Sequence, residues 1–282
     1  MSELLSQPLV TVYIPTHNRA ELVCRAVESV QKQSYRNIEI IVVDDGSTDS
    51  TYEALSGYIA ASEIVYLKND VPKGAPYARN RAIQNAKGKF ITGLDDDDFF
   101  LSGRIESLLE NYDDKYSFIS SGYKVIYEDF ERPEHNGDRV VTLDDILRAN
   151  VVGNQVLVKV ECLRQLGGFD NDLPAWQDYD MWIRLIRRYG SGFRVGKALY
   201  VVDKSHPHER ISGNTDKVDK AYELFLSKHL EFKERKYFSY LKVSHMHYHL
   251  DKASLKEVLT TFAGGAYKRS LGLIARKYGV KA

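Results

Sequence analysis

Short apolar runs and helical apolar spacings alternate along the first hundred residues. The runs at 9–14, 38–43 and 64–67 are rich in β-branched residues and predict strands; the second is continuous enough to be buried on both faces. After the first run, apolar residues recur at the spacing of one helix face, at Leu22, Val23, Ala26, Val27 and Val30. The alternation predicts an α/β fold with a doubly wound, mostly parallel sheet flanked by helices.

A fourth apolar run, 90–94, ends directly in four consecutive aspartates, Asp95 to Asp98. Ligands bind at the carboxyl ends of strands in open α/β sheets. Clustered carboxylates repel one another unless something positive binds among them, and their oxygens suit Mg²⁺ or Mn²⁺ holding a phosphorylated substrate. The alternative is a solvated acidic turn, which the bulky residues 99–101 argue against. We therefore predict a divalent metal site here.

Polar turns follow the other predicted strands as well. Residues 15–19 and 44–49 are rich in side chains that cap backbone groups, and a helix carrying Arg79 follows the third strand. The turn at 15–19 has a structural alternative, in which Thr16 or Asn18 caps the next helix. Polar groups from several strand ends are thus expected to meet at one edge of the sheet.

Five segments stand in the order and spacing typical of one enzyme family. They are 12–19, 41–49, 74–80, 94–98 and 177–182. Together they resemble the family 2 glycosyltransferases, which have the GT-A fold, over about residues 8–213. The resemblance implies an inverting enzyme that moves a sugar from a nucleotide-sugar donor, UDP-linked, to a carbohydrate or lipid-linked acceptor in surface polysaccharide synthesis.

The resemblance also implies which residues bind the nucleotide. Asp44 lies where the family contacts the uracil imide, with Asp45 as the alternative, and Arg79 would approach the base or the diphosphate. Asp95 would hold the ribose or the metal's water shell, with Asp96 beside it. The turn that would wrap the base and ribose consists of Pro15, Thr16, His17, Asn18 and Arg19.

The family's metal ligand maps onto Asp97, which would hold Mn²⁺ or Mg²⁺ at the two donor phosphates. Asp98 is expected to anchor the turn. A later loop supplies a further candidate ligand, His206 or else His208, of which we favour His206. Arg210, in the same loop, would grip the pyrophosphate.

Sugar transfer needs a base that removes the proton of the acceptor hydroxyl. Asp178 matches the family's base, although Gln177 stands where the family usually has Glu. That replacement removes a charge expected to contact the acceptor and leaves the base intact. The alternative role for Asp178 is a helix cap, and Asp180 is expected to be structural.

Composition agrees with one catalytic domain and an appendix. We expect a catalytic domain at 1–213, with a nucleotide-sugar half at about 1–100 and an acceptor half at about 101–213, followed by helices at 214–282. Two cysteines imply neither disulfides nor a zinc site. No signal peptide or membrane-spanning run is evident, which predicts a cytoplasmic protein. The irregular stretch 127–138 is the expected insertion loop on the acceptor side.

The zero net charge hides an asymmetry, because residues 233–282 contain 11 Lys and Arg against 3 Asp and Glu, a net +8. With interleaved aromatics, this tail predicts three or four short amphipathic helices broken near Gly264–Gly265. It suits an anionic membrane surface, on the inner face of the cytoplasmic membrane, or else a helical subdomain packed on the core. Nucleic acid fits poorly because the remaining chain is acidic.

Four basic side chains of this tail are expected to be exposed, namely Lys268, Arg269, Arg276 and Lys277. Its three histidines, His245, His247 and His249, are expected to lie on the surface without an acidic partner.

Two rival functions remain at this stage. A nucleotidyltransferase shares the strand order and the metal-bound diphosphate, but it usually carries a glycine-rich phosphate loop with a lysine after the first strand, and residues 15–19 have neither. A non-catalytic protein that binds nucleotide sugars is the other rival, which Gln177 keeps open. Binding without turnover would identify it.

Overall fold

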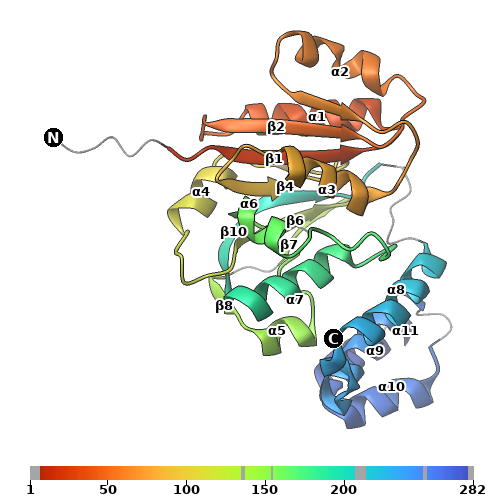
Figure 1. Ribbon diagram of the computed structural model, residues 1–282. Helices are drawn as coiled ribbons and strands as arrows, with labels where there is room; N and C mark the ends of the chain where they lie inside the picture. Colours follow the sequence, from red (N-terminus) through yellow and green to blue (C-terminus); the bar gives the residue numbers. More distant parts are fainter. Residues whose placement is uncertain (1–6, 135–136, 154, 207–213, 250–252, 279–282) are drawn as a thin grey trace.

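The structure is a computed structural model that describes residues 7–134, 137–153, 155–206, 214–249 and 253–278. Two mixed sheets and their helices form the upper and middle parts of the molecule in Figure 1, and the C-terminal helices lie below them. None of the helices in the described ranges combines the length and apolar composition needed to cross a membrane.

The first sheet has the strand order β3-β2-β1-β4-β9, in which only the edge strand β9 is antiparallel. Its strands are β1 (Val10–Thr16), β2 (Ile38–Asp44), β3 (Val65–Lys68), β4 (Phe90–Gly93) and β9 (Val158–Lys159). Parallel strands need crossovers, and the chain supplies them as α1 (Ala20–Gln31), α2 (Thr51–Ala60) and α3 (Ala75–Asn85).

Both faces of this sheet are covered, as the run 38–43 predicted. Ile40 and Val42 of β2 pack in the cluster that contains the apolar faces of α1 and α2. Ile41 and Val43, which point to the opposite face, pack in the cluster that contains α3. The prediction of a doubly wound, mostly parallel sheet is therefore confirmed.

The second sheet has the order β5-β10-β6-β7, with β8 also paired to β10. Its strands are β5 (Phe99–Phe100), β6 (Ile119–Ile126), β7 (Glu131–Glu134), β8 (Arg139–Val141) and β10 (Gly192–Asp203). The prediction of an irregular loop at 127–138 was wrong in part, because β7 pairs with β6 as a hairpin. Tyr127 and Phe130 stack at its turn.

The remaining helices of the catalytic part pack on the two sheets and on one another. They are α4 (Arg104–Glu110), α5 (Leu143–Arg148), α6 (Val160–Gln165) and α7 (Gln177–Tyr189). Trp182 and its neighbours on α7 are buried against Phe118 and Phe169. This packing fixes α7, and with it the position of Asp178 in its first turn.

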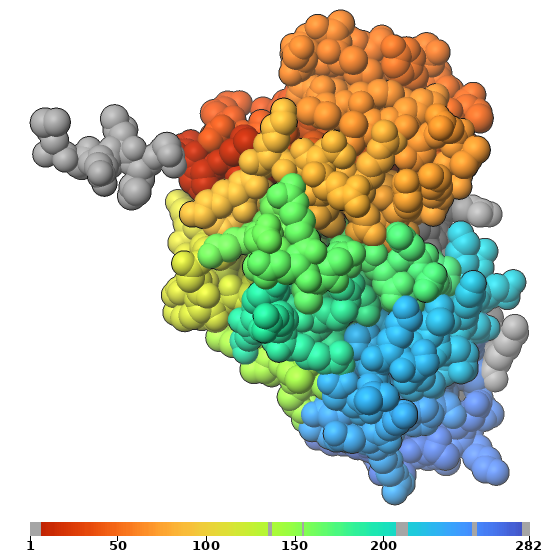
Figure 2. Space-filling model, viewed as in Figure 1, coloured from red at the N-terminus to blue at the C-terminus, as the bar shows by residue number. Residues whose placement is uncertain are grey.

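The described part of residues 214–282 forms short helices, as predicted. They are α8 (Thr215–Lys228), η2 (Leu230–Lys233), α9 (Arg235–Met246), η3 (His247–His249), α10 (Leu255–Thr261), η4 (Phe262–Ala266) and α11 (Tyr267–Tyr278). The break falls at Gly265, whose φ of 101° suits glycine. Phe225 and Leu241 enter the core cluster of α7, so the tail packs on the catalytic part, as Figure 2 shows for its blue surface.

Candidate active site

The carboxyl ends of β1, β2 and β4 open into a cavity of about 720 Å³. Adjacent pairing brings these strand ends together: the amide of Asp45 donates to Thr16, and that of Leu94 donates to Tyr13. Most of the residues singled out from the sequence line this cavity, namely Pro15, Thr16, His17, Arg19, Asp45, Arg79, Asp95, Asp96, Asp97 and Asp178. Asn18 and Asp44 do not, and neither does His206.

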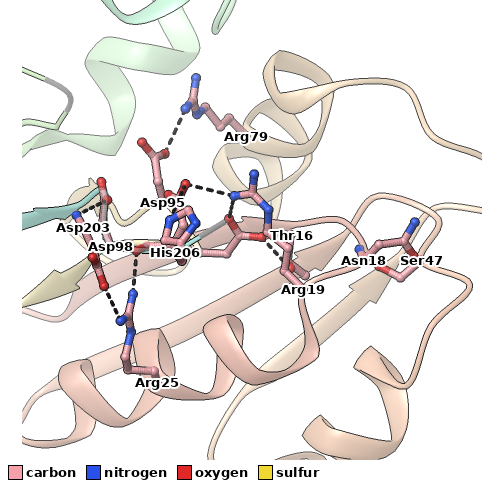
Figure 3. Close-up of polar contacts among 12 residues, drawn as sticks. Thr16, Asn18, Arg19, Arg25, Ser47, Arg79, Asp95, Asp98, Asp203 and His206 are labelled. Carbon is pink, nitrogen blue, oxygen red and sulfur yellow. Dashed lines mark hydrogen bonds and ion pairs between the residues drawn. The ribbon is translucent and has the colours of Figure 1, made fainter. Parts of the chain in front are cut away.

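Arginines from separate elements contact the acidic run (Figure 3). Arg19 Nη1 lies 2.8 Å from Asp96 Oδ1 and 3.1 Å from Asp97 Oδ2, while Arg79 pairs with Asp95 at 3.0 Å. Arg19 and Arg79 therefore offset part of the repulsion between the neighbouring aspartates. Burial raises the pKa of Asp96 to about 6 despite Arg19.

Asp98, at the end of the run, has the turn role expected of it. It is fully buried, accepts a hydrogen bond from Tyr200 at 2.8 Å and accepts another from the amide of Asp203 at 3.1 Å. Arg25 joins the same region, since it donates to Asp203 at 2.5 Å and to the carbonyl of Asp97 at 2.6 Å. These contacts hold the acidic run against the second sheet.

The donor set at Asp97 fits a divalent ion. His206 Nε2 lies 3.5 Å from Asp97 Oδ2, and both side chains are less than a tenth exposed. That separation suits two ligands on one ion, and the carboxylate suits Mn²⁺ or Mg²⁺. His208 and Arg210 lie outside the described residues.

Asp44 and Asp45 have different surroundings, which the sequence did not separate. Asp44 is fully buried beneath the cavity, where its oxygens accept from Ser47 and Tyr66. Asp45 lies on the cavity wall and accepts from Asn69 and the amide of Gly74, at 2.6 and 2.7 Å. Of the two, only Asp45 lines the cavity.

The turn at 15–19 does not cap its helix in the way considered from the sequence. Arg19 is the residue before α1, with no side-chain capping bond. Thr16 instead donates to Asp96 at 2.8 Å. Asn18, with φ of 53°, accepts from the amide of Thr48 at 2.8 Å and so ties this turn to the one after β2.

Arg79 is buried, and the polar contacts in the described structure leave part of its guanidinium unused. Nη2 pairs with Asp95, whereas Nε and Nη1 are buried without a hydrogen-bond partner among the described residues. Buried donors without acceptors are costly. Because Arg79 also lines the cavity, its positive charge lies close to the space that a ligand anion would occupy.

Asp178 lies in the first turn of α7 and is not its cap, because Trp176 holds that position. Asn150 donates to Asp178 at 3.3 Å. Burial raises the pKa of Asp178 to about 6, opposed by the positive charge of Arg79. A carboxylate with this pKa is ionised at neutral pH and can accept a proton. Asp180, by contrast, pairs with Arg184 and His229 at 2.7 and 3.0 Å, in the structural role expected of it.

Sequence reasoning missed the aromatic and tail residues of this cavity. Trp176 lines the cavity and has a left-handed backbone conformation, with φ of 61°. This conformation is unusual for an aromatic residue, and residues that adopt it cluster at functional sites. Tyr248 lies beside it, with ring centroids 6.3 Å apart. Ser244, His247 and Arg269 also line the cavity. The basic aromatic composition of the tail was visible, but its place at this site was not.

Two expectations for the tail were wrong. His245 and His249 do have an acidic partner, because both contact Asp219 of α8, at 2.6 and 2.7 Å. Lys268 and Arg276 are exposed, but Arg269 and Lys277 are partly buried: Arg269 donates to the backbone carbonyl of Arg148, and Lys277 to that of Ala253.

Comparison with known proteins gives matches in sequence and in fold. The profile of "Glycosyl transferase family 2" matches residues 11–165. The chain is 33% identical over 237 residues to the putative colanic acid biosynthesis glycosyl transferase WcaA of Escherichia coli K12, covering 79% of this chain and 82% of that protein. It is 30% identical over 187 residues to the UDP-Glc:alpha-D-GlcNAc-diphosphoundecaprenol beta-1,3-glucosyltransferase WfaP of Escherichia coli. That alignment covers 64% of this chain and 71% of WfaP.

A solved structure shares the fold at low sequence identity. TarS of S. aureus, in complex with UDP-GlcNAc, superposes with a TM-score of 0.66 and 17% identity, covering 96% of this chain and 83% of that one. The similarity confirms the GT-A architecture with its helical C-terminal part. With the profile match and the relatives, the conclusion is that the chain belongs to glycosyl transferase family 2.

Proposed function

We propose that this protein transfers a sugar, with inversion, from a UDP-linked donor to a carbohydrate or lipid-linked glycan acceptor in surface polysaccharide synthesis. The observation that carries the proposal is the presence in one cavity of the acidic run, Arg79 and a carboxylate, Asp178, whose pKa is about 6. WfaP and TarS, whose names or titles contain UDP-sugars, support the choice of donor.

The donor would lie along residues 1–100. Asp45 would accept from the uracil imide, because it faces the cavity and Asp44 does not. The ribose would lie at Asp95, and Arg79 would bind a donor phosphate. Asp97 and His206 would hold Mn²⁺ or Mg²⁺, which when bound neutralises charge on the diphosphate.

Asp178 would act as the base. Its carboxylate takes the proton of the acceptor hydroxyl while that oxygen forms a bond to the anomeric carbon. The bond from that carbon to the diphosphate oxygen breaks, and its electron pair leaves with the nucleoside diphosphate. Attack from the face opposite the leaving group inverts the anomeric centre.

The tail offers a surface for an anionic membrane, where a lipid-linked acceptor would be held. Exposed apolar residues lie with basic ones along a groove formed by α9 and α10, lined by Arg235, Phe238, Lys242, Leu255, Lys256 and Leu259. Phe238, Leu255 and Leu259 are 38, 52 and 54% exposed. We propose that this groove face docks on the inner face of the cytoplasmic membrane.

Liposome co-sedimentation tests the docking face. Charge reversal at Arg235 and Lys256 should weaken recovery with anionic vesicles, by on the order of 1 kcal/mol per residue at low salt. Reversal at Lys87 and Lys197, exposed on the catalytic part, is the matched control. Equal recovery of both variants would rule out this surface.

A panel of nucleotide sugars with Mn²⁺ tests the catalytic proposal. A UDP-sugar should raise the melting temperature and be hydrolysed slowly in the absence of acceptor, since water can replace the acceptor hydroxyl. Thermal shift without hydrolysis, for every donor and acceptor tried, would favour a non-catalytic binding protein. A response to nucleoside triphosphates in place of nucleotide sugars would favour a nucleotidyltransferase.

A further inference from the structure

The tail places a basic side chain on the wall of the cavity. Arg269 of α11 lines the cavity, and its Nη1 donates to the carbonyl of Arg148 at 2.7 Å. No carboxylate among the described residues lies within ion-pair distance of it. Burial lowers the pKa of Arg269, because the charged form is partly removed from water. A desolvated cation of this kind is stabilised when an anion binds beside it.

The neighbouring wall is also basic. His247 of η3 lines the same cavity, and Arg276 Nη1 lies 2.5 Å from its Nε2. Burial and the positive charges of Arg276, Arg269 and Lys204 lower the pKa of His247, so the ring is neutral at pH 7. The donor end of the cavity, with its aspartates at 95–97, has the opposite charge.

Contacts with α8 hold this wall in place. Asp219 accepts from His245 and His249, the residues on either side of His247 and Tyr248. Tyr222 of α8 also stacks on His245, with centroids 4.3 Å apart. The segment that carries the wall is therefore fastened at both ends.

The same wall adjoins the base. Tyr248 lies beside Trp176, and Trp176 precedes Asp178 by two residues in the chain. Burial raises the pKa of Tyr248, and the negative charge of Asp178 raises it further. An acceptor hydroxyl in contact with Asp178 would therefore place the rest of the acceptor near Trp176, Tyr248 and the tail. The two aromatic rings offer apolar faces to a sugar.

We propose that the tail forms an acceptor subsite for an anionic group, phosphate or carboxylate, which Arg269 contacts directly. This rests on the proposed function, since it assumes that the acceptor binds at Asp178. Two acceptor classes supply such a group: a glycan on a lipid diphosphate and a glycan with an acidic sugar. A neutral acceptor would leave the guanidinium of Arg269 unpaired.

Calorimetry on the full chain, saturated with UDP and excess Mn²⁺, tests the subsite with defined probes. Farnesyl diphosphate represents the lipid diphosphate; nitrophenyl β-glucuronide and nitrophenyl β-glucoside differ only in the carboxylate. We expect at least one charged probe to bind more tightly than the glucoside. Arg269→Gln should weaken that probe about 10-fold or more, as loss of a charge-assisted contact does.

Lys268→Gln is the matched control, because Lys268 is adjacent and exposed, and it should change nothing. Arg269→Lys keeps the charge and should restore part of the affinity, and unchanged melting temperatures show that the variants are folded. Equal binding of charged probes to wild type and Arg269→Gln, or no preference over the glucoside, would overturn the subsite. Absence of UDP-sugar hydrolysis from the wild-type protein would instead count against the proposed function.

Discussion

Asp178→Asn should make the protein more stable and nearly inactive at the same time. The amide keeps the shape of the side chain and can still accept from Asn150. It cannot take the acceptor proton, so acceptor-dependent turnover should fall by about 10²–10⁴, the range for loss of a general base. It also removes a buried charge, which is the origin of the gain in stability.

The size of the gain follows from the pKa. Asp178 shifts from 3.8 to about 6 on folding, and two pKa units correspond to an upper limit of about 3 kcal/mol. Solvent in the cavity screens the partly exposed carboxylate, so we expect about 1 kcal/mol. A raised carboxylate pKa means that folding disfavours the ionised form; the penalty is full above about pH 6 and absent below about pH 4. At pH 7.5 the melting temperature should rise by about 2–4 °C.

Asp180→Asn is the matched control, on the same helix and with the opposite sign. Its pairs with Arg184 and His229 hold the pKa of Asp180 below its ordinary value, although burial opposes this. These pairs stabilise the fold at pH values above the pKa that Asp180 has in the unfolded chain. The stabilisation is lost as the pH falls through the pKa that Asp180 has in the folded protein. Asp180→Asn should therefore melt lower than wild type at pH 7.5.

Three measurements separate the outcomes: melting temperature from pH 4 to 8, UDP affinity by calorimetry, and turnover with acceptor. UDP affinity should be unchanged in Asp178→Asn. A lower melting temperature for Asp178→Asn at pH 7.5 would refute the argument that its charge is buried without full compensation. Wild-type turnover would show that the base lies elsewhere.

Three further predictions concern the metal, the pH profile and the packing of glycines. Chelation or Asp97→Ala should remove most UDP affinity, because the diphosphate would then face unscreened carboxylates; undiminished calorimetric binding would refute the metal role. The wild-type kcat/KM should fall tenfold per pH unit below about pH 6, as Asp178 becomes protonated; a flat profile to pH 5 would contradict this. Gly93→Ala should destabilise the fold by more than about 1 kcal/mol, because the new methyl group would overlap the ring of Tyr13. Gly57→Ala, in the middle of α2 with open space around it, should stabilise by about 0.5–1 kcal/mol, and chemical denaturation compares the two.

Much of the donor side could be predicted from the sequence because its signals are local. The strand at 38–43 is apolar at every position except Glu39, and the acidic run follows a buried strand. Parallel pairing then brings the ends of β1 and β4 together, which places Thr16 beside Asp96. Residues 80 positions apart could thus be assigned to one site from their place at strand ends.

The choice between neighbouring residues needed the structure. Asp44 and Asp45 are the same residue type in one turn, and strand periodicity alone does not say which oxygen atoms the protein itself uses. The structure does, because Asp44 is fully buried with Tyr66 and Ser47, whereas Asp45, which accepts from Asn69 and Gly74, also lines the cavity.

The sequence by itself determined the α/β fold, the acidic strand end and the candidate base, because hydrophobic periodicity and turn composition act over a few residues. Only the tertiary structure decided where the tail goes. Its helices carry charge and aromatic residues that suit a membrane or a protein surface equally well, and side-chain packing places one side of them on the catalytic part. That packing brings Tyr248 and Arg269 to the cavity of Asp178, at separations in the chain over which no local pattern carries information.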